Sequence, residues 1–208
     1  MLIAIMLHCY IINHLILLVM EEILVFLSKI YPKLSDECKA YLRDVAKQKE
    51  VKKGEILLRP GQVCRNLYFI KKGLLRCYYI LNDEEVTNWF FWENRAVVSI
   101  RSWYTQTPGK QFIQALEDCE LYAISYDELE YAYEHFLEVN YVGRVLTIDY
   151  LMIWEALVEN IRQTTAAERY QLVLEQQPEV LQRVPLRDLA TWLNMTPETL
   201  SRIRSKFH

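Results

Sequence analysis

Side chains able to contact nucleic acid are concentrated near the C-terminus, in a segment that reads TPETLSRIRSK over residues 196–206. An arginine guanidinium matches the two acceptors of guanine in the major groove, and a carboxylate can accept a hydrogen bond from the cytosine amine. Arg202 is therefore the predicted base reader, and Glu198 is a second candidate. Hydroxyl and ammonium groups hold the phosphate backbone without reading sequence. The residues predicted for that role are Thr199, Ser201, Ser205 and Lys206.

The spacing of apolar residues places this segment on the second of two short amphipathic helices. In the first helix, apolar residues recur at i, i+3, i+4 and i+7. They are Leu186, Leu189, Ala190 and Leu193. Asn194 then suits a turn, because asparagine tolerates positive φ. Thr196 is a good N-cap, and it is also among the residues predicted to contact DNA. The second helix is predicted over 197–207, with Leu200, Ile203 and Phe207 pointing inward.

Two amphipathic helices joined by a turn are also the pattern of an ordinary helical hairpin, so the distribution of charge helps to decide. From Arg183 to the C-terminus there are five Lys or Arg and two Asp or Glu, a local balance of +3. The whole chain carries −3, so the remainder carries −6. A basic end on an acidic body favours a helix-turn-helix that binds DNA.

Composition indicates a soluble globular protein without catalytic machinery. With 208 residues and 52% hydrophobic content, the chain can bury a sizeable core and is long enough for two unequal domains. The five cysteines, at 9, 38, 64, 77 and 119, have no close pair, which argues for reduced thiols in a cytoplasmic protein. The four histidines are scattered, and there is no nucleophile elbow, phosphate loop or repeated metal-ligand spacing. We therefore expect no enzyme, no metal and no other cofactor.

An apolar N-terminal extension, residues 1–20, precedes the globular pattern and is nearly long enough to span a bilayer. A secretory signal is disfavoured because no Lys or Arg precedes the run and no small-residue cleavage site follows it. A membrane anchor would place His8, Asn13 and His14 in hydrocarbon, which is costly. A start site assigned too early is favoured over an anchor, since Met20 is followed by an ordinary beginning of a soluble domain.

Residues 21–135 are predicted to form a β-roll with leading helices. A helical pattern runs from 21 to 45, broken by Pro32 and restarted by Ser35 as an N-cap. Short β-branched and aromatic runs follow, separated by glycine-containing turns. These runs are 55–58, 67–70, 74–81, 86–92, 111–116 and 120–125. They predict an antiparallel sandwich or roll of about eight strands, so the fold class is α+β.

A long helix over 136–163 is expected next, because this stretch contains no proline and apolar residues recur on adjacent faces. It has more apolar surface than one roll can cover, which favours a seam packed against a second copy of the chain. The alternative is a helix that simply lies on its own roll. Thr165 and Glu168 then form a capping box, which starts a C-terminal domain over 164–208.

This order of elements resembles the Crp/Fnr superfamily of bacterial transcription regulators, over residues 21–208. The most specific stretches are TTAAERYQLVLEQQPEVLQRVP at 164–185 and LATWLNMTPETLSRIRSKF at 189–207, which look like the family's linker and helix-turn-helix. The run GEILLRPGQVCRNLYFIKKGLLRCYY at 54–79 is similar to the opening of its cyclic-nucleotide-binding domain. The resemblance implies a homodimer that binds double-stranded promoter DNA and contacts RNA polymerase.

Departures from the family pattern change the expected effector. Members that respond to cyclic AMP hold the ribose with Glu and the phosphate with Arg, whereas Ser99 and Gly109-Lys110 occupy those positions here. Lys110 and Arg101 supply charge but not the bidentate grip, so we predict no tight binding of cyclic AMP. The cysteine spacing does not match the family's iron–sulfur cluster. A β-hairpin wing, which many members have after the recognition helix, is not expected in a chain that ends at His208.

Ser99, Arg101 and Lys110 thus mark a predicted effector pocket whose small-molecule ligand is unknown, unless the roll serves only as a scaffold. The pocket could have aromatic walls, although such residues are more often plain core. The aromatic candidates are Trp89, Phe90, Phe91, Trp92, Trp103 and Tyr104. A signalling or scaffold protein that retains the fold without binding DNA is the competing class, and the outward Arg202 and Lys206 argue against it.

Overall fold

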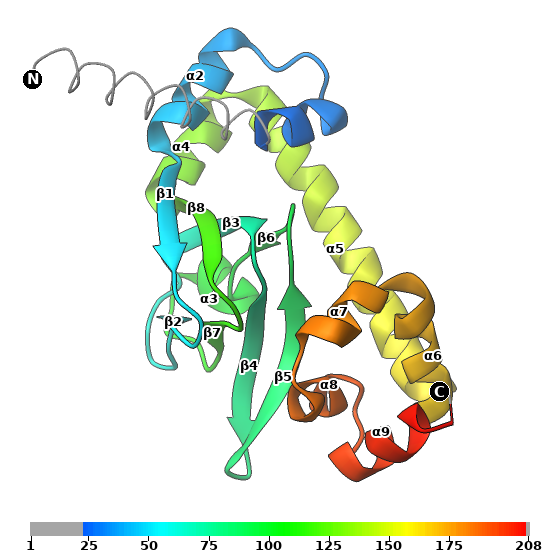
Figure 1. Ribbon diagram of the computed structural model, residues 1–208. Helices are drawn as coiled ribbons and strands as arrows, with labels where there is room; N and C mark the ends of the chain where they lie inside the picture. Colours follow the sequence, from blue (N-terminus) through cyan, green and yellow to red (C-terminus); the bar gives the residue numbers. More distant parts are fainter. Residues whose placement is uncertain (1–22, 207–208) are drawn as a thin grey trace, which may run out of the picture.

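The chain forms an eight-stranded antiparallel roll, then a long helix and a group of shorter C-terminal helices (Figure 1). The computed structural model describes residues 23–206. The strands are β1 Lys47–Val51, β2 Ile56–Leu58, β3 Asn66–Lys72, β4 Leu75–Leu81, β5 Glu84–Phe91, β6 Ala96–Val97, β7 Phe112–Ala115 and β8 Cys119–Ser125. They make two four-stranded sheets, ordered β1-β8-β3-β6 and β2-β7-β4-β5.

The core of the roll lies between the two sheets, because alternate side chains of each strand turn inward. Leu75 of β4, Ile113 of β7 and Leu121 of β8 each have 0% exposure. The strand pairs of both sheets are antiparallel, as in β1 and β8, which pair in register from Lys47 with Ala123 to Val51 with Cys119. The predicted antiparallel roll is therefore confirmed.

Two strands were not predicted from the sequence. β1 reads KQKEV and lies at the edge of its sheet, where only Val51 is buried. A strand with one buried residue lacks the apolar alternation by which strands are recognised. β6 has two residues and is too short to show any period.

Helices cover one end of the roll (Figure 1). Residues 23–30 are helical, and α2 spans Asp36–Val45. The predicted N-cap is confirmed, since the Ser35 hydroxyl accepts a hydrogen bond from the Cys38 N–H at 3.1 Å. Beside α2 lies α4, Tyr126–His135, which begins with a capping box between Ser125 and Glu128; the rings of Tyr41 and Tyr131 stack between the two helices. A short helix, α3 at Ile100–Thr105, was not predicted.

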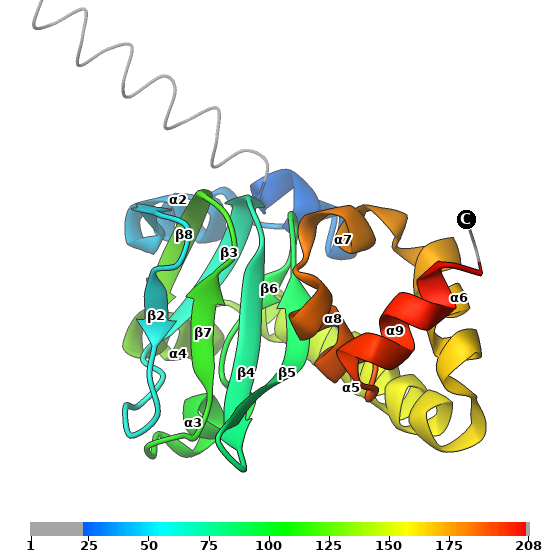
Figure 2. The ribbon, with the colours of Figure 1, turned by 60° about the horizontal axis from the view of Figure 1, so that its bottom comes forward.

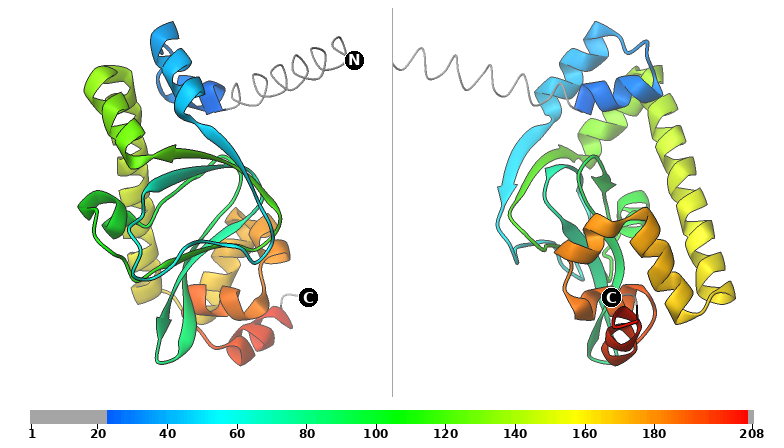
Figure 3. Two further views of the ribbon diagram at one scale, coloured as in Figure 1. Left: turned by 90° about the vertical axis from the view of Figure 1, so that its left-hand side faces the viewer. Right: turned by 45° about the vertical axis from the view of Figure 1, so that its right-hand side comes forward.

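The long helix is confirmed as α5, Leu137–Gln163, and it runs the length of the roll (Figure 3). One face packs on the roll, where Val139 and Val142 are buried. Gly143 lets Tyr133 approach, since a Cβ at this glycine would stand 2.7 Å from the tyrosine ring. The opposite face is exposed and apolar, with Leu151 at 68% and Met152 at 61% exposure. The helix therefore lies on its own roll and also carries the surplus apolar surface that the sequence predicted.

Four shorter helices complete the described chain: α6 Ala166–Gln176, α7 Pro178–Arg183, α8 Leu186–Trp192 and α9 Pro197–Arg204. The capping box of Thr165 and Glu168 that starts α6 is confirmed. The second helix of the predicted helix-turn-helix is shorter than expected, since it ends at Arg204 rather than 207. The Ser205 hydroxyl donates to the Arg202 carbonyl at 2.9 Å, and the Lys206 N–H donates to Ile203 in a tighter turn.

The four described cysteines are free and buried, as expected of reduced thiols. Burial raises the pKa of Cys77 to about 12 and that of Cys38 to about 11, so both remain protonated near neutral pH. Among residues 23–206 no helix is long and apolar enough to cross a membrane. The predicted N-terminal extension, with Cys9, and the predicted inward residue Phe207 lie outside the described residues.

Gly73, between β3 and β4, occupies a position that only glycine fits. Its φ of +111° is disfavoured for residues with a side chain, and a Cβ there would meet the Cys119 Sγ at 2.5 Å and Cα at 2.9 Å. Gly54 shares the positive φ, at +86°, but has nothing within 4 Å of the same position. An alanine at Gly54 would thus suffer backbone strain alone, whereas an alanine at Gly73 would suffer both backbone strain and a steric clash.

We predict that Gly73→Ala destabilises the protein more than Gly54→Ala. Gly54→Ala should lower the free energy of unfolding by about 1–2 kcal/mol through strain alone. Gly73→Ala should lose a further ~1–3 kcal/mol, because the added methyl meets the backbone of β8. Urea unfolding of both variants measures the difference. Equal losses would show that the close approach to Cys119 has no energetic consequence.

Candidate nucleic-acid interface and effector cavity

The helix-turn-helix predicted from the sequence is present in α8, α9 and the turn between them. Asn194 has φ +53°, as the turn requires, and the Thr196 hydroxyl caps α9 by accepting from the Thr199 N–H at 3.2 Å. The two helices share a small core, whose buried members are Leu189, Ala190, Leu193, Leu200 and Ile203. Leu186, predicted to belong to this apolar stripe, is instead 37% exposed.

The seven predicted DNA-contacting residues all lie on or beside α9, at its surface. Six are exposed, and Thr199 is half-buried. Arg202 lies on α9, and Lys206 lies in the turn just after its last residue; both side chains are exposed. Within residues 23–206 the guanidinium of Arg202 makes no ion pair, which leaves its donors available to a partner.

Hydrogen bonds within α9 limit what three of these side chains can do. The hydroxyls of Thr196 and Thr199 lie 3.2 Å apart and serve the helix cap, and that of Ser205 is bound to the Arg202 carbonyl. The backbone N–H of Glu198 and the Thr196 side chain lower the pKa of Glu198, so its carboxylate is charged at the start of the helix. Arg202, Ser201 and Lys206 are thus better placed for intermolecular contacts than the two threonines.

The helix-turn-helix is docked on the roll through α8, which packs against β5 (Figure 2). The Thr191 hydroxyl accepts a hydrogen bond from the Thr87 N–H of β5 at 3.1 Å. Trp192 sets its ring at 88° to that of Trp89 and at 79° to that of Phe90, with ring centres 5.7 and 5.3 Å apart. The α9 helix is therefore held at a fixed place relative to the roll by α8.

A buried ion pair lies at the centre of this interface. Arg76 of β4, whose side chain is 5% exposed, pairs with Asp188 of α8. The same guanidinium binds Glu85 at 2.6 Å and Gln114 at 2.9 Å. Burial raises the pKa of Asp188, and the nearby charge of Arg76 only partly opposes that rise. Sequence analysis missed Asp188, because a lone acid next to an apolar stripe reads as a solvent-exposed residue.

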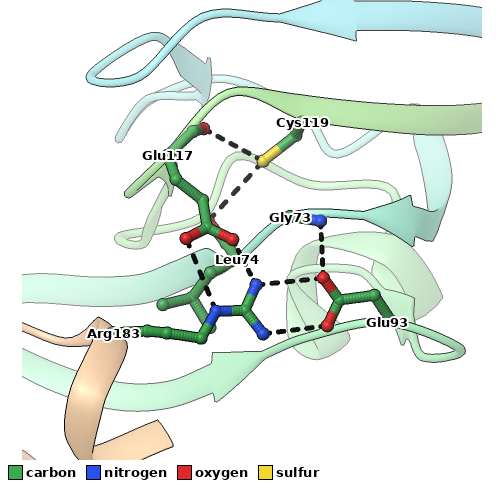
Figure 4. Close-up of polar contacts among 6 residues, drawn as sticks. All are labelled: Gly73, Leu74, Glu93, Glu117, Cys119 and Arg183. Carbon is green, nitrogen blue, oxygen red and sulfur yellow. Dashed lines mark hydrogen bonds and ion pairs between the residues drawn. The ribbon is translucent and has the colours of Figure 1, made fainter. Parts of the chain in front are cut away.

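A second set of ion pairs joins α7 to the loops that follow β5 and β7 (Figure 4). The Arg183 guanidinium makes two bonds to the Glu93 carboxylate, at 2.9 and 3.0 Å, and also pairs with Glu117. Burial works against ionisation of Glu93, but its bonds from Arg183 and from the Gly73 N–H, at 2.8 Å, hold its pKa below the ordinary value. The Cys119 thiol beside them donates to the backbone carbonyls of Glu117 and Leu74, so it is structural.

The three residues predicted for the effector pocket line one cavity of about 580 Å³ between the roll and α5. Ser99 is buried and donates a hydrogen bond to the Gln111 Oε1 at 2.7 Å, while Arg101 and Lys110 are exposed at the rim. Tyr150 and Trp154 of α5 close the cavity. Its described lining includes both cations and no acidic side chain, so the cavity suits an anionic ligand.

The aromatic residues predicted as walls of that pocket have different surroundings. Trp89 and Phe91 do line the cavity. Phe90 and Trp103 are buried at 0% and 3% exposure and belong to the core. Tyr104 is 61% exposed, and Trp92 lines a different cavity. Trp154, which the sequence did not mark, lies with its ring centre 5.8 Å from that of Trp89.

Comparison with known proteins identifies the roll and the overall fold. Residues 48–136 match the family model of the cyclic nucleotide-binding domain. FixK2 from Bradyrhizobium japonicum is 20% identical, with a TM-score of 0.70 over 79% of this chain and 85% of that one. The c-di-GMP-responsive regulator CLP of Xanthomonas campestris is 17% identical, with a TM-score of 0.66 over 83% and 91%. No curated protein sequence matches the chain.

A transcriptional regulator from Eubacterium rectale, described as a Crp/Fnr family protein, is 19% identical. Its TM-score is 0.67 over 86% of this chain and 85% of that one. At such identities the likeness shows a shared fold. Residues 48–136 are therefore similar to cyclic nucleotide-binding domains, and the chain shares its fold with solved Crp/Fnr regulators, as the sequence resemblance implied.

We predict that Arg76→Met destabilises the protein in a pH-dependent way. Loss of one partner of a buried ion pair costs about 3–5 kcal/mol, so the free energy of unfolding should fall by about that amount at neutral pH. Asp188 has a higher pKa in the folded than in the unfolded state, so its carboxyl is tolerated at low pH and disfavours folding as the pH rises. Removing Arg76 increases that effect, and the deficit should shrink toward pH ~4.

Urea unfolding of Arg76→Met and the parent chain across this pH range measures the effect. Arg162→Met is the matched control, because Arg162 is an exposed arginine in the last turn of α5. The control should change the free energy of unfolding by less than about 0.5 kcal/mol. A deficit that is independent of pH, or no larger than that of the control, would contradict the buried ion pair.

Proposed function

We propose that this chain, which has the fold of Crp/Fnr regulators, is a cytoplasmic transcription regulator that reads double-stranded promoter DNA. The observation that carries the proposal is the surface of α9, where Arg202 projects outward from a capped helix whose other face is buried, and the exposed Lys206 follows in the closing turn. The second helix of a helix-turn-helix enters the major groove in this way. Arg202 is the proposed base reader, with Glu198 beside the bases and Ser201 and Lys206 on phosphates.

We further propose that the protein acts as a homodimer through the exposed face of α5. Tyr141, Ile148, Leu151, Met152 and Val158 recur there at helical spacing and are all more than 40% exposed. A parallel pairing of two such helices would relate two α9 helices by a two-fold axis, as two DNA half-sites require. Contact with RNA polymerase would follow from binding at a promoter, and it rests on the resemblance to Crp/Fnr regulators.

The proposed effector is an anionic small molecule other than cyclic AMP, bound in the cavity that Ser99, Arg101 and Lys110 line. Its volume of about 580 Å³ falls within the range of small-molecule sites. Ser99 is already bonded to Gln111, and the two cations at the rim are single, exposed charges. None of them provides the buried bidentate phosphate contact of a tight cyclic-nucleotide site. The corresponding proposed division of the chain is an N-terminal extension at 1–20, the roll with its leading helices at 21–135, the dimerisation helix at 136–163 and the DNA-binding domain at 164–208.

We predict that Arg202→Ala and Lys206→Ala weaken binding to duplex DNA in different ways. Arg202→Ala should relax base preference by about 1–3 kcal/mol at one position of the site. Lys206→Ala should weaken binding to all sequences and reduce the salt dependence by about one counterion. Salt titrations with fluorescent duplexes measure both effects. Lys39→Ala, on α2 at the opposite end of the molecule, is the control and should bind like the parent chain.

Absence of affinity for any duplex at low salt would contradict the proposal. It would leave the alternative of a signalling or scaffold protein that keeps the cyclic nucleotide-binding fold without binding DNA. Equal effects of Arg202→Ala on all sequences would instead remove Arg202 from base reading and assign it to phosphate.

A further inference from the structure

A second cavity, of about 220 Å³, lies where the roll, α5 and the C-terminal helices meet. It is separate from the cavity at Ser99, which has a different set of lining residues apart from Trp89. Trp89 and Trp92 come from the roll, Leu157 from α5, Val173 from α6 and Trp192 from α8. A molecule bound here would touch the roll, α5, α6 and α8 at once. The relative positions of these elements determine where α9 lies.

The walls of this cavity favour a flat, apolar body. Three tryptophan rings line it together with aliphatic side chains from two helices. The volume is below that of drug-sized ligand sites, which begin near 300 Å³, so the ligand would be small. A single aromatic ring with short substituents fits both conditions.

Two buried polar atoms at the cavity call for hydrogen-bond partners. Among residues 23–206, the indole N–H of Trp192 and the Oε1 of Gln177 are buried side-chain atoms without one. Trp192 is only 7% exposed, so it has little access to solvent. Buried polar groups in folded proteins are nearly always hydrogen-bonded. A ligand with one acceptor and one donor would satisfy both atoms.

The charged side chains that line the cavity indicate that the ligand carries a negative charge. Its lining includes Arg95 and Arg169 and, within the described chain, no acidic side chain. The Arg169 guanidinium is fixed by the backbone carbonyls of Thr164 at 2.7 Å, Leu193 at 2.8 Å and Asn194 at 3.3 Å. These carbonyls satisfy its donors but carry no negative charge, and within residues 23–206 Arg169 makes no ion pair. A carboxylate near Arg169 and Trp192 would therefore be stabilised by both charge and hydrogen bonding.

We propose that this cavity is a second ligand site, specific for a small planar aromatic carboxylate that carries a hydroxyl or ring N–H donor. The ring lies among the tryptophans, the carboxylate accepts from the Trp192 N–H, and the donor binds the Gln177 Oε1. Ligand binding does not depend on the proposed DNA-binding function. The ligand would also hold α9 in place relative to the roll and α5. Only the effect of that on DNA binding rests on the proposed function.

Calorimetry of the full chain without DNA tests the proposal, with 4-hydroxyphenylacetate as the probe. We expect saturable binding, at least tenfold tighter than that of the uncharged alcohol 2-(4-hydroxyphenyl)ethanol. Trp192→Phe keeps an aromatic ring but removes the N–H, and it should weaken binding of the acid about tenfold. Val173→Phe fills the cavity and should abolish binding.

Matched variants separate this site from its surroundings. Leu174→Phe makes the same kind of enlargement at the next position of α6, which is 38% exposed and outside the cavity, and it should bind like the parent chain. Lys110→Ala alters the other cavity and should also leave binding unchanged. Circular dichroism and thermal unfolding establish that each variant is folded.

Three results would overturn the proposal. They are no binding of 4-hydroxyphenylacetate, equal binding of the acid and the alcohol, and acid binding that survives Val173→Phe in a folded variant. Because no DNA is present, none of these results bears on whether the chain reads DNA. Conversely, failure of DNA binding would leave a positive calorimetric result standing.

Discussion

The buried ion pair of Arg76 and Asp188 is the constraint on which the placement of α9, the proposed DNA-reading helix, depends. Arg76 is the second residue of β4 and its side chain is 5% exposed, so its charge is tolerated only if its donors are bound. Asp188 completes that set from α8, alongside Glu85 and Gln114. The pair thus fixes α8 against the outer face of the roll. The α9 helix, joined to α8 by the four residues 193–196, is positioned with it.

Trp89 connects this interface to the ligand-sized cavities. It lines both the cavity at Ser99 and the one at Trp192, and its ring contacts Trp154 of α5 and Trp192 of α8. An occupant of either cavity would therefore press on a side chain that also touches the helix-turn-helix. Packed aromatic rings have few alternative arrangements. A displacement of Trp89 would therefore move α5 or α8 as a whole. This provides a physical route from the proposed effector sites to α9, the proposed DNA-reading helix.

Local signals allowed most of the fold to be predicted from the sequence. Caps at Ser35, Thr165 and Thr196 and the turn at Asn194 depend on neighbouring residues only, and all four are present. What failed depends on distant contacts. The edge strand β1 has almost no buried face to detect, and Asp188 is buried by an arginine 112 positions away. The end of α9 was misplaced because side-chain bonds of its last turn compete with the helix.

The central claim is that two copies of this chain read DNA through α9. Selection of duplexes from a random library by the full chain tests it most directly. The account predicts enrichment of two inverted half-sites whose centres are about 10 base pairs, or a multiple of that, apart. It also predicts that one base pair of each half-site loses its preference when Arg202→Ala is used in place of the parent chain. Recovery of unenriched sequences, or of a single half-site without symmetry, would contradict it.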